Sequence, residues 1–233
     1  MSLYFSQPYL GLSGGLQTKQ GGPAWTLQDN FDNAGLYTQI GTLVTVDSGA
    51  SDALFFNAAS NASDQRVHRS LGFTLSDTTW HARITMNFSL MTAPGHLVTQ
   101  FNSGTGDPVS VAEDRLTLNL GNDTNSLLLA RYDNAIHGGA GWDASGSTIG
   151  LSTSTQYYVA QTRLSSTSFR LNVFSDSTYT TNITGSPVTY TIASTIQNLA
   201  NFHSGNTGTG NSGRIVTGTL DSLRVNNGST GAP

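Results

Sequence analysis

A glycine-rich segment at residues 137–146, HGGAGWDASG, carries a single tryptophan among small residues. Glycine has no side chain that could cover the Trp142 ring, and several polar side chains stand close to it in the sequence. Proteins bind sugars by stacking an exposed aromatic ring on the sugar, while amides and carboxylates bind the hydroxyls. The segment therefore predicts a carbohydrate site formed by Trp142, Asp143, His137, Tyr132, Asp133 and Asn134. In the alternative, Trp142 folds back onto a sheet edge and packs there as a small extension of the core.

Residue patterns for catalysis are missing. Retaining glycosidases need two carboxyl groups ~5 Å apart, and inverting enzymes need them ~6.5–9.5 Å apart. Glu113 is the only glutamate, and no two aspartates stand two or four residues apart on a convincing strand. The chain has no cysteine and no G-x-S-x-G motif, and its scattered histidines lack zinc-binding spacing. We therefore expect no enzymatic activity.

Charged residues are few, and their balance limits the expected partners. The 233 residues include 10 Lys and Arg against 14 Asp and Glu, a net charge of −4. Lys19 is the only lysine and there is no basic cluster, so we expect neither nucleic acid nor an anionic membrane as a partner. No apolar run approaches ~18 residues, so no segment is expected to span a membrane. The N-terminal sequence lacks the pattern of a signal peptide, so either the chain is not exported by a signal peptide or the signal peptide was removed earlier.

The elements that must position the site are strands. Residues 79–90, TWHARITMNFSL, alternate between apolar and polar without interruption. Side chains of a strand point alternately to opposite faces, so this segment has one dry face and one wet face, as in antiparallel sheets. Trp80 is expected in the core, whereas His81 here and His68 on an earlier strand are expected at the surface.

Other segments follow the same pattern. QYYVAQTRL and SFRLNVFS indicate a hairpin that turns at residues 165–167, and residues 196–201 form a short helical candidate. About a dozen short strands with almost no helix indicate an all-β, two-sheet antiparallel sandwich. We expect an extended N-terminal arm over residues 1–24, the sandwich over 25–228 and a C-terminal tail over 229–233. A disordered tail is the alternative to the arm.

Three segments together frame residues 25–228: LQDNFDNAG with GTLVTVDSG, then QYYVAQTRLSSTSFRLNVFSDS, and finally GTLDSLRVNNG. In this order they resemble the concanavalin A-like lectin/glucanase superfamily, in its laminin G-like branch. The resemblance implies a jelly roll of two curved antiparallel sheets, with a concave face that often binds glycans. The glucanase motif Glu-x-Asp-x-x-Glu is absent, and HLVTQFN offers His96 and Gln100 without the alginate-lyase motif.

A structural calcium ion is a further implication of the resemblance. Laminin G-like domains often hold one where the first and last strands meet, and the matching positions are Asp29, Asp32 and Asp221. Calcium prefers oxygen ligands. Asp221 interrupts a strand beside core positions, where a free carboxylate is costly unless paired or metal-bound. In the alternative, Asp221 caps backbone amides or pairs with an arginine such as Arg224.

These observations predict a non-catalytic module for carbohydrate binding or adhesion, at the virion surface or outside the cell. Its partner would be a glycan or polysaccharide, and other virion or surface proteins would bind the N-terminal arm. One alternative is a structural virion protein without glycan activity, such as a capsid decoration, head fibre or tail module. Another is a domain of a secreted bacterial polysaccharide-binding protein.

Overall fold

The computed structural model describes residues 24–47, 51–61, 64–92, 96–107, 111–120, 127–133, 147–206 and 211–232, with backbone only at 60–61, 96–97, 127–133, 206 and 211–214. These residues form two antiparallel sheets that pack into a sandwich, which confirms the predicted fold class. Within this described part, no helix is long and apolar enough to cross a membrane. The predicted N-terminal arm, except for its last residue, lies outside the described residues.

The eight-stranded sheet has the order β13-β12-β11-β6-β15-β4-β3, and β1 pairs with β15 beside this path. Its strands are β1 (Leu27–Asp29), β3 (Val44–Asp47), β4 (Ala53–Asn61), β6 (Trp80–Met91), β11 (Gln156–Ser165), β12 (Ser168–Phe174), β13 (Val188–Thr191) and β15 (Asn211–Asn227). The long alternating segment of the sequence is β6, at the centre of this sheet between β11 and β15.

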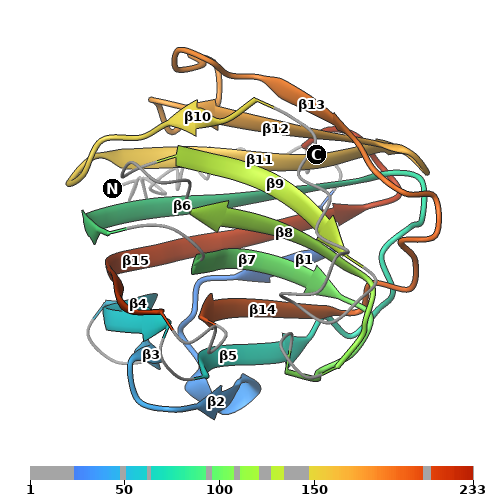
Figure 1. The fold of residues 1–233 in the computed structure, drawn as a ribbon. Helices are drawn as coiled ribbons and strands as arrows, with labels where there is room; N and C mark the ends of the chain where they lie inside the picture. The colour runs from blue at the N-terminus through green and yellow to red at the C-terminus, as the bar shows by residue number, and fades with distance from the viewer. Residues whose placement is uncertain are drawn as a thin grey trace, which may run out of the picture.

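The seven-stranded sheet has the order β10-β9-β8-β7-β14-β5-β2. Its strands are β2 (Thr38–Ile40), β5 (Gln65–Ser70), β7 (His96–Asn102), β8 (Arg115–Leu120), β9 (Leu127–Asp133), β10 (Ile149–Gly150) and β14 (Asn201–Asn206), and a short 3-10 helix, η1 (Ala34–Leu36), precedes β2. Figure 1 shows β9, β8, β7 and β14 side by side across the middle of the molecule.

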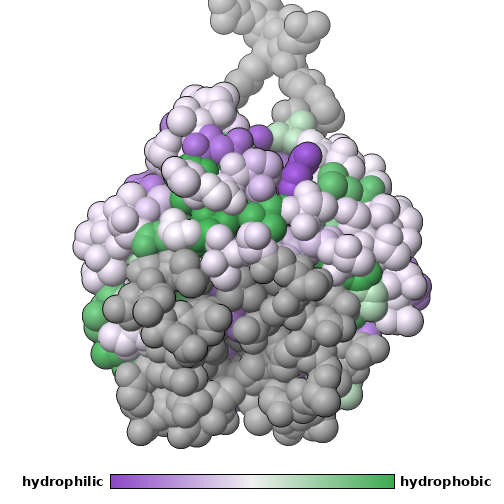
Figure 2. Space-filling model, turned by 45° about the horizontal axis from the view of Figure 1, so that its top comes forward, coloured by the Kyte–Doolittle hydropathy of each residue, from purple (hydrophilic) through white to green (hydrophobic). Residues whose placement is uncertain are grey.

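The core lies between the sheets and is centred on Trp80, whose side chain is fully buried as predicted. Its ring centroid is 4.9 Å from that of Phe101 on β7 and 5.8 Å from that of Phe169 on β12, so it joins the two sheets. Truncation of such a buried aromatic side chain typically costs ~3–5 kcal/mol. In the coloured part of Figure 2, pale and green areas predominate and saturated purple is confined to small areas, as expected when 10% of residues are charged.

The predicted hairpin is confirmed, because β11 and β12 pair up to Ser165 and Ser168. The helical candidate at residues 196–201 is wrong. Carboxylates of distant loops bond its backbone: Gln197 N donates to Asp114 (2.9 Å) and Asn198 N donates to Asp77 (3.0 Å). These bonds take the place of helical ones, and the chain enters β14 at residue 201.

The surface positions expected for His68 and His81 are wrong as well. His81 is only 6% exposed, because the Trp25 ring stacks on it with centroids 6.0 Å apart. His68 is half-buried and stacks on His203 at 5.0 Å. Alternation gives the face of the sheet on which a side chain lies, but it does not show that a second layer of side chains covers that face.

Candidate functional site

Four neighbouring strands of the seven-stranded sheet carry polar side chains on their outer face. Val67 on β5, Phe202 on β14, Phe101 on β7 and Leu116 on β8 belong to the core. Because side chains alternate along a strand, the residues beside them point away from the core. This outer polar face comprises Arg66, His68, Asn201, His203, Gln100, Asn102, Arg115, Thr117 and Asn119.

The strand register aligns these side chains in rows across the sheet. One row runs from His68 through His203 and Gln100 to Thr117, since each pairs with the next. A second row runs from Asn201 through Asn102 to Arg115. Residues paired in this way have β-carbons ~4.5–5.5 Å apart, so one ligand can contact several of them.

Three amide side chains of this face are buried and have no hydrogen-bond partner among the described residues. Gln100 and Asn102 are fully buried, and Asn119 is 1% exposed. No hydrogen bond within the described part of the chain satisfies either the amide nitrogen or the amide oxygen of these three side chains. An unsatisfied buried polar group costs ~1–3 kcal/mol, so such a cluster indicates water or a ligand with donors and acceptors of its own.

His203 adds an acceptor to the same rows. Its Nε2 lies 3.1 Å from the carbonyl oxygen of Gly104, which can only accept, so Nε2 carries the proton. Nδ1 then has a lone pair, and it has no partner among the described residues. Burial, together with His68 and Arg66, holds the pKa of His203 well below its ordinary value, so the ring is neutral near pH 7.

The two arginines of the face are bound to loops at its border. Arg66 pairs with Asp64 at 3.1 Å and donates to the carbonyl oxygen of Gly106 at 2.8 Å. Arg115 lies 3.6 Å from Glu113 and donates to a backbone carbonyl at 2.6 Å. The single glutamate of the chain also accepts from the Gly106 backbone at 2.9 Å, so its contacts hold this loop.

Most of the carbohydrate site predicted from the sequence falls outside the described residues, namely Asn134, His137, Trp142 and Asp143. Tyr132 and Asp133 belong to β9, where the backbone register pairs Asp133 with Arg115 and Tyr132 with Leu116. Asp133 therefore continues the second row of the outer polar face, whereas Tyr132 occupies a position of the opposite face. The Trp142 site stays a prediction.

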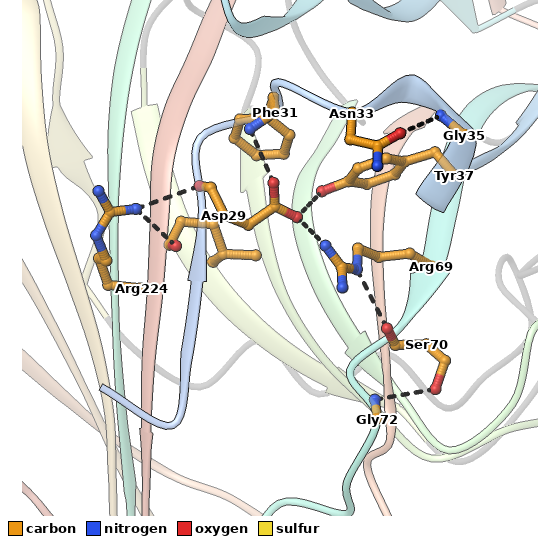
Figure 3. Close-up of polar contacts among 10 residues, drawn as sticks. Asp29, Phe31, Asn33, Gly35, Tyr37, Arg69, Ser70, Gly72 and Arg224 are labelled. Carbon is orange, nitrogen blue, oxygen red and sulfur yellow. Dashed lines mark hydrogen bonds and ion pairs between the residues drawn. The ribbon is translucent and has the colours of Figure 1, made fainter. Parts of the chain in front are cut away.

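The three predicted calcium ligands do not form one group. Asp29 is 5% exposed, and its carboxylate accepts hydrogen bonds from Phe31 N (2.8 Å), from the Tyr37 hydroxyl and from the Arg69 guanidinium (Figure 3). Asp32 is exposed, and Asp221 accepts from Ser222 Oγ at 3.1 Å.

Among the described residues, no three His, Cys, Asp or Glu side chains lie close enough together to hold a metal ion. As arranged here, protein donors occupy the oxygens of Asp29, and this donor set does not fit a calcium ion. Calcium binding stays a prediction.

The outer polar face was missed in the sequence, although Gln100 was noted in HLVTQFN. Its signal was present in TQFN, LTLNL and NFHSG, where polar and apolar residues alternate on three separate segments. Such alternation indicates a solvated face by default. Only the pairing of β14 with β7 and of β7 with β8 shows that the amides lie together and are buried.

No protein-family model and no curated protein matches this sequence. Several solved structures resemble the fold. The lectin UEA-II, solved with galactose, is 12% identical with a TM-score of 0.54, over 87% of this chain and 99% of that one. The alginate lyase Aly36B is 13% identical with a TM-score of 0.52, over 88% and 98%. The globular domain of T. cruzi calreticulin is 6% identical with a TM-score of 0.54, over 88% of each chain.

At these identities the likeness concerns the fold alone, and it confirms the concanavalin A-like sandwich. It does not identify the laminin G-like branch. A lectin and a lyase both occur among these structures, so the fold does not separate binding from catalysis.

Proposed function

We propose that this protein is a non-catalytic carbohydrate-binding module whose binding surface is the outer polar face of the seven-stranded sheet. Gln100, Asn102 and Asn119 bind sugar hydroxyls through their amides, and His203 accepts a hydroxyl proton at Nδ1. The observation that carries the proposal is the set of buried amide groups without partners on one sheet face.

The chemistry of these groups favours a polyhydroxylated, uncharged ligand. A hydroxyl both donates and accepts, and a primary amide offers two donors and an acceptor, so the two groups satisfy each other. The arginines of the face are already bound to acids and carbonyls, so they are not arranged to attract an anion. Fold-level similarity to a lectin solved with galactose supports the ligand class.

The test is a glycan and polysaccharide array with the purified protein, followed by calorimetry on any glycan that binds. Asn102→Ala should abolish or strongly reduce binding, because the side chain lies in the second row between Asn201 and Arg115. Asn172→Ala is the matched control, because Asn172 lies on β12 of the other sheet. Equal binding by both variants would contradict the proposal, as would a protein that binds no glycan.

A second function is favoured by His203. A neutral imidazole whose Nδ1 has no partner among the described residues can act as a general base. This arrangement suits β-elimination on a uronic-acid polymer, and a lyase of alginate has the same fold. Incubation with alginate distinguishes the two functions. An ultraviolet-absorbing unsaturated product, lost in His203→Ala, would support the lyase, and binding without product would support the module.

Two finer assignments go with the proposed function. Membership of the laminin G-like branch rests on the three sequence segments, and location outside the cell or on a virion rests on the low-charge, Ser/Thr/Asn-rich composition. Immunogold labelling of the native source would test the location.

A further inference from the structure

Four arginines with described side chains form no ion pair, and three of them lie together on the outer face of the eight-stranded sheet. The fourth, Arg163, is buried on the inner side of β11 and donates to the carbonyls of Ser165 and Ser166. Arg66, Arg69 and Arg115 form ion pairs, whereas Arg83, Arg170 and Arg224 do not. Arg83 is on β6, Arg170 on β12 and Arg224 on β15, and the register through β11 places them on one face. This grouping places three guanidinium groups on one sheet face, where Asp221 pairs in register with Thr85.

A cavity of about 270 Å³ opens on this face, lined by Trp25, Arg83, Thr85, Tyr158, Ser177, Tyr179, Ser222 and Arg224. The volume is slightly below the ~300–1,000 Å³ of typical small-molecule sites, which suits one sugar unit. Three of the lining side chains are aromatic and two are cationic. This cavity lies on the sheet opposite to the outer polar face, so it does not depend on the function proposed above.

Arg83 is held between two aromatic rings. Its guanidinium carbon is 3.9 Å from the Tyr179 ring centroid and 5.7 Å from the Trp25 centroid. Its Nε donates to His81 Nε2 at 3.2 Å, and His81 Nδ1 is bonded to Thr162 Oγ1 at 2.9 Å. Within the described residues the two terminal nitrogens of Arg83 have no hydrogen-bond partner, so they are oriented donors without an acceptor.

The loop that carries Tyr179 is fixed in an unusual backbone conformation. Tyr179 has φ 59°, and Ser222 on the other side of the cavity has φ 58°. Positive φ is rare for a bulky residue such as tyrosine and often occurs at functional sites. The carboxylate of Asp176 accepts from the backbone of Thr180 (3.2 Å) and Thr181 (2.6 Å), which closes the loop and places Tyr179 over Arg83.

No acidic side chain of the described structure forms an ion pair with Arg83 or Arg224. Asp176 is used by its own loop, and Asp221 accepts from Ser222. Arg224 donates to the carbonyl of Asp29 (3.3 Å) and to the side chain of Asn30 (2.7 Å), both of which are uncharged acceptors. Neither Arg83 nor Arg224 therefore has its charge neutralised in the described structure.

We propose that this cavity is a second binding site, specific for a sugar that carries a carboxylate, such as a uronic acid. The terminal nitrogens of Arg83 bind the two carboxylate oxygens, and the sugar ring packs on the aromatic side chains Trp25 and Tyr158. Guanidinium and carboxylate match in a two-point geometry, and aromatic faces bind the apolar side of a sugar ring. Because the aromatic side chains contact the sugar ring of the ligand, this site should bind an acidic sugar more tightly than a small carboxylate that has no ring.

The test is an NMR titration of the full chain with D-glucuronate, with D-glucose and acetate as separate arms, observing the Trp25 indole NH. Glucuronate should shift this signal at concentrations where glucose and acetate do not. Arg83→Gln should weaken glucuronate binding by about tenfold or more, because it removes the charged partner.

Thr85→Glu is a second variant, since it leaves the arginine–aromatic stack in place and supplies an internal carboxylate that competes with the ligand. Gln197→Met, at an exposed position outside both proposed sites, should leave glucuronate binding unchanged. The glycan array tests the outer polar face separately, so failure of one site is distinguishable from failure of the other. Equal shifts with acetate would overturn the sugar specificity. Absence of shifts with glucuronate, or full binding by Thr85→Glu, would overturn the site.

Discussion

Replacement of Gln100 by methionine separates a binding surface from a structural one. Gln100 is fully buried on β7, and neither polar atom of its amide has a partner among the described residues. Methionine keeps the length and the unbranched shape of glutamine but has no strong polar group. If the amide serves a ligand, the variant should be more stable and should bind the glycan more weakly.

The magnitude follows from the desolvation of the amide. An unsatisfied buried group costs ~1–3 kcal/mol, and a buried water that bonds it in the free protein reduces the gain. We therefore expect the lower limit, a free energy of unfolding about 1 kcal/mol higher. For a domain of 150–250 residues this raises Tm by ~2–4 °C. Loss of one or two hydrogen bonds of ~0.5–1.5 kcal/mol each should weaken glycan binding by roughly two- to 150-fold.

The assays are urea unfolding, calorimetric Tm and titration with the glycan found on the array. Gln197→Met is the matched control, because Gln197 is exposed in the loop before β14 and donates through its side chain only to the Ser194 carbonyl. It should change neither stability nor affinity. A Gln100→Met protein that is less stable and binds glycan as well as the parent would refute the reasoning, since the amide would then have a structural partner.

Three further predictions concern the stability of the sandwich and the ionisable groups Asp29 and His81. Gly205→Ala should lower the free energy of unfolding, measured in urea, by more than about 2 kcal/mol. The reason is that Gly205 has φ +134° and that a β-carbon there would lie 2.3 Å from a backbone oxygen of β5. The control Gly150→Ala should change the free energy of unfolding by less than ~0.5 kcal/mol. Asp29→Asn should lower the free energy of unfolding by about 3 kcal/mol, equally in calcium and in EDTA, because it leaves the partly buried Arg69 unpaired. The control Asp32→Asn, at an exposed position, should have little effect. A loss of stability seen only in calcium would instead support a metal site. Burial lowers the pKa of His81 to about 4, whereas the same side chain in the unfolded protein titrates at ~6.5. The contribution of this ring to the free energy of unfolding should therefore be highest above pH ~6.5 and should fall by about 3 kcal/mol as the pH decreases towards 4. The difference in unfolding free energy between the parent and His81→Asn measures this effect, and a difference that does not change with pH would contradict it.

The sandwich was predictable because strand periodicity is a local property. The alternation in residues 79–90 gave the two faces of β6 and the core position of Trp80. The hairpin between β11 and β12 was predictable for the same reason, since its strands are adjacent in sequence. Elements whose backbone bonds to distant side chains, such as residues 197 and 198, were not predictable, because the partners lie 83 and 121 residues away.

Neither candidate site could be read from the sequence, and the reason is topological. The amides of the outer polar face come from β7, β8 and β14. β7 and β8 follow each other along the chain, whereas β14 begins only at residue 201 and yet pairs with β7 in the sheet. The cavity on the other sheet joins Trp25 near the start of the described chain with Arg224 near its end. The residues of HGGAGWDASG could be predicted as one site because they are adjacent in the sequence. The side chains of the two candidate sites become neighbours only when the strands pair into sheets.

The two sheet faces differ in the distribution of charge, and the two proposed sites would therefore differ in the ligands that they select. On the seven-stranded sheet, Arg66 and Arg115 of the outer polar face are paired with acids. Three neutral amides and the neutral imidazole of His203 have polar atoms without partners among the described residues. On the eight-stranded sheet, the arginines lack acids and one is stacked between aromatic rings. An uncharged hydroxyl gains little from a free guanidinium, and a carboxylate gains little from an amide oxygen. A polysaccharide that carries both neutral and acidic units would therefore engage the two faces with different units, and one copy of the protein could bridge two chains. Cross-linking of such a polymer, measured as a rise in viscosity that Arg83→Gln and Gln100→Met each remove, is the outcome that requires both sites at once.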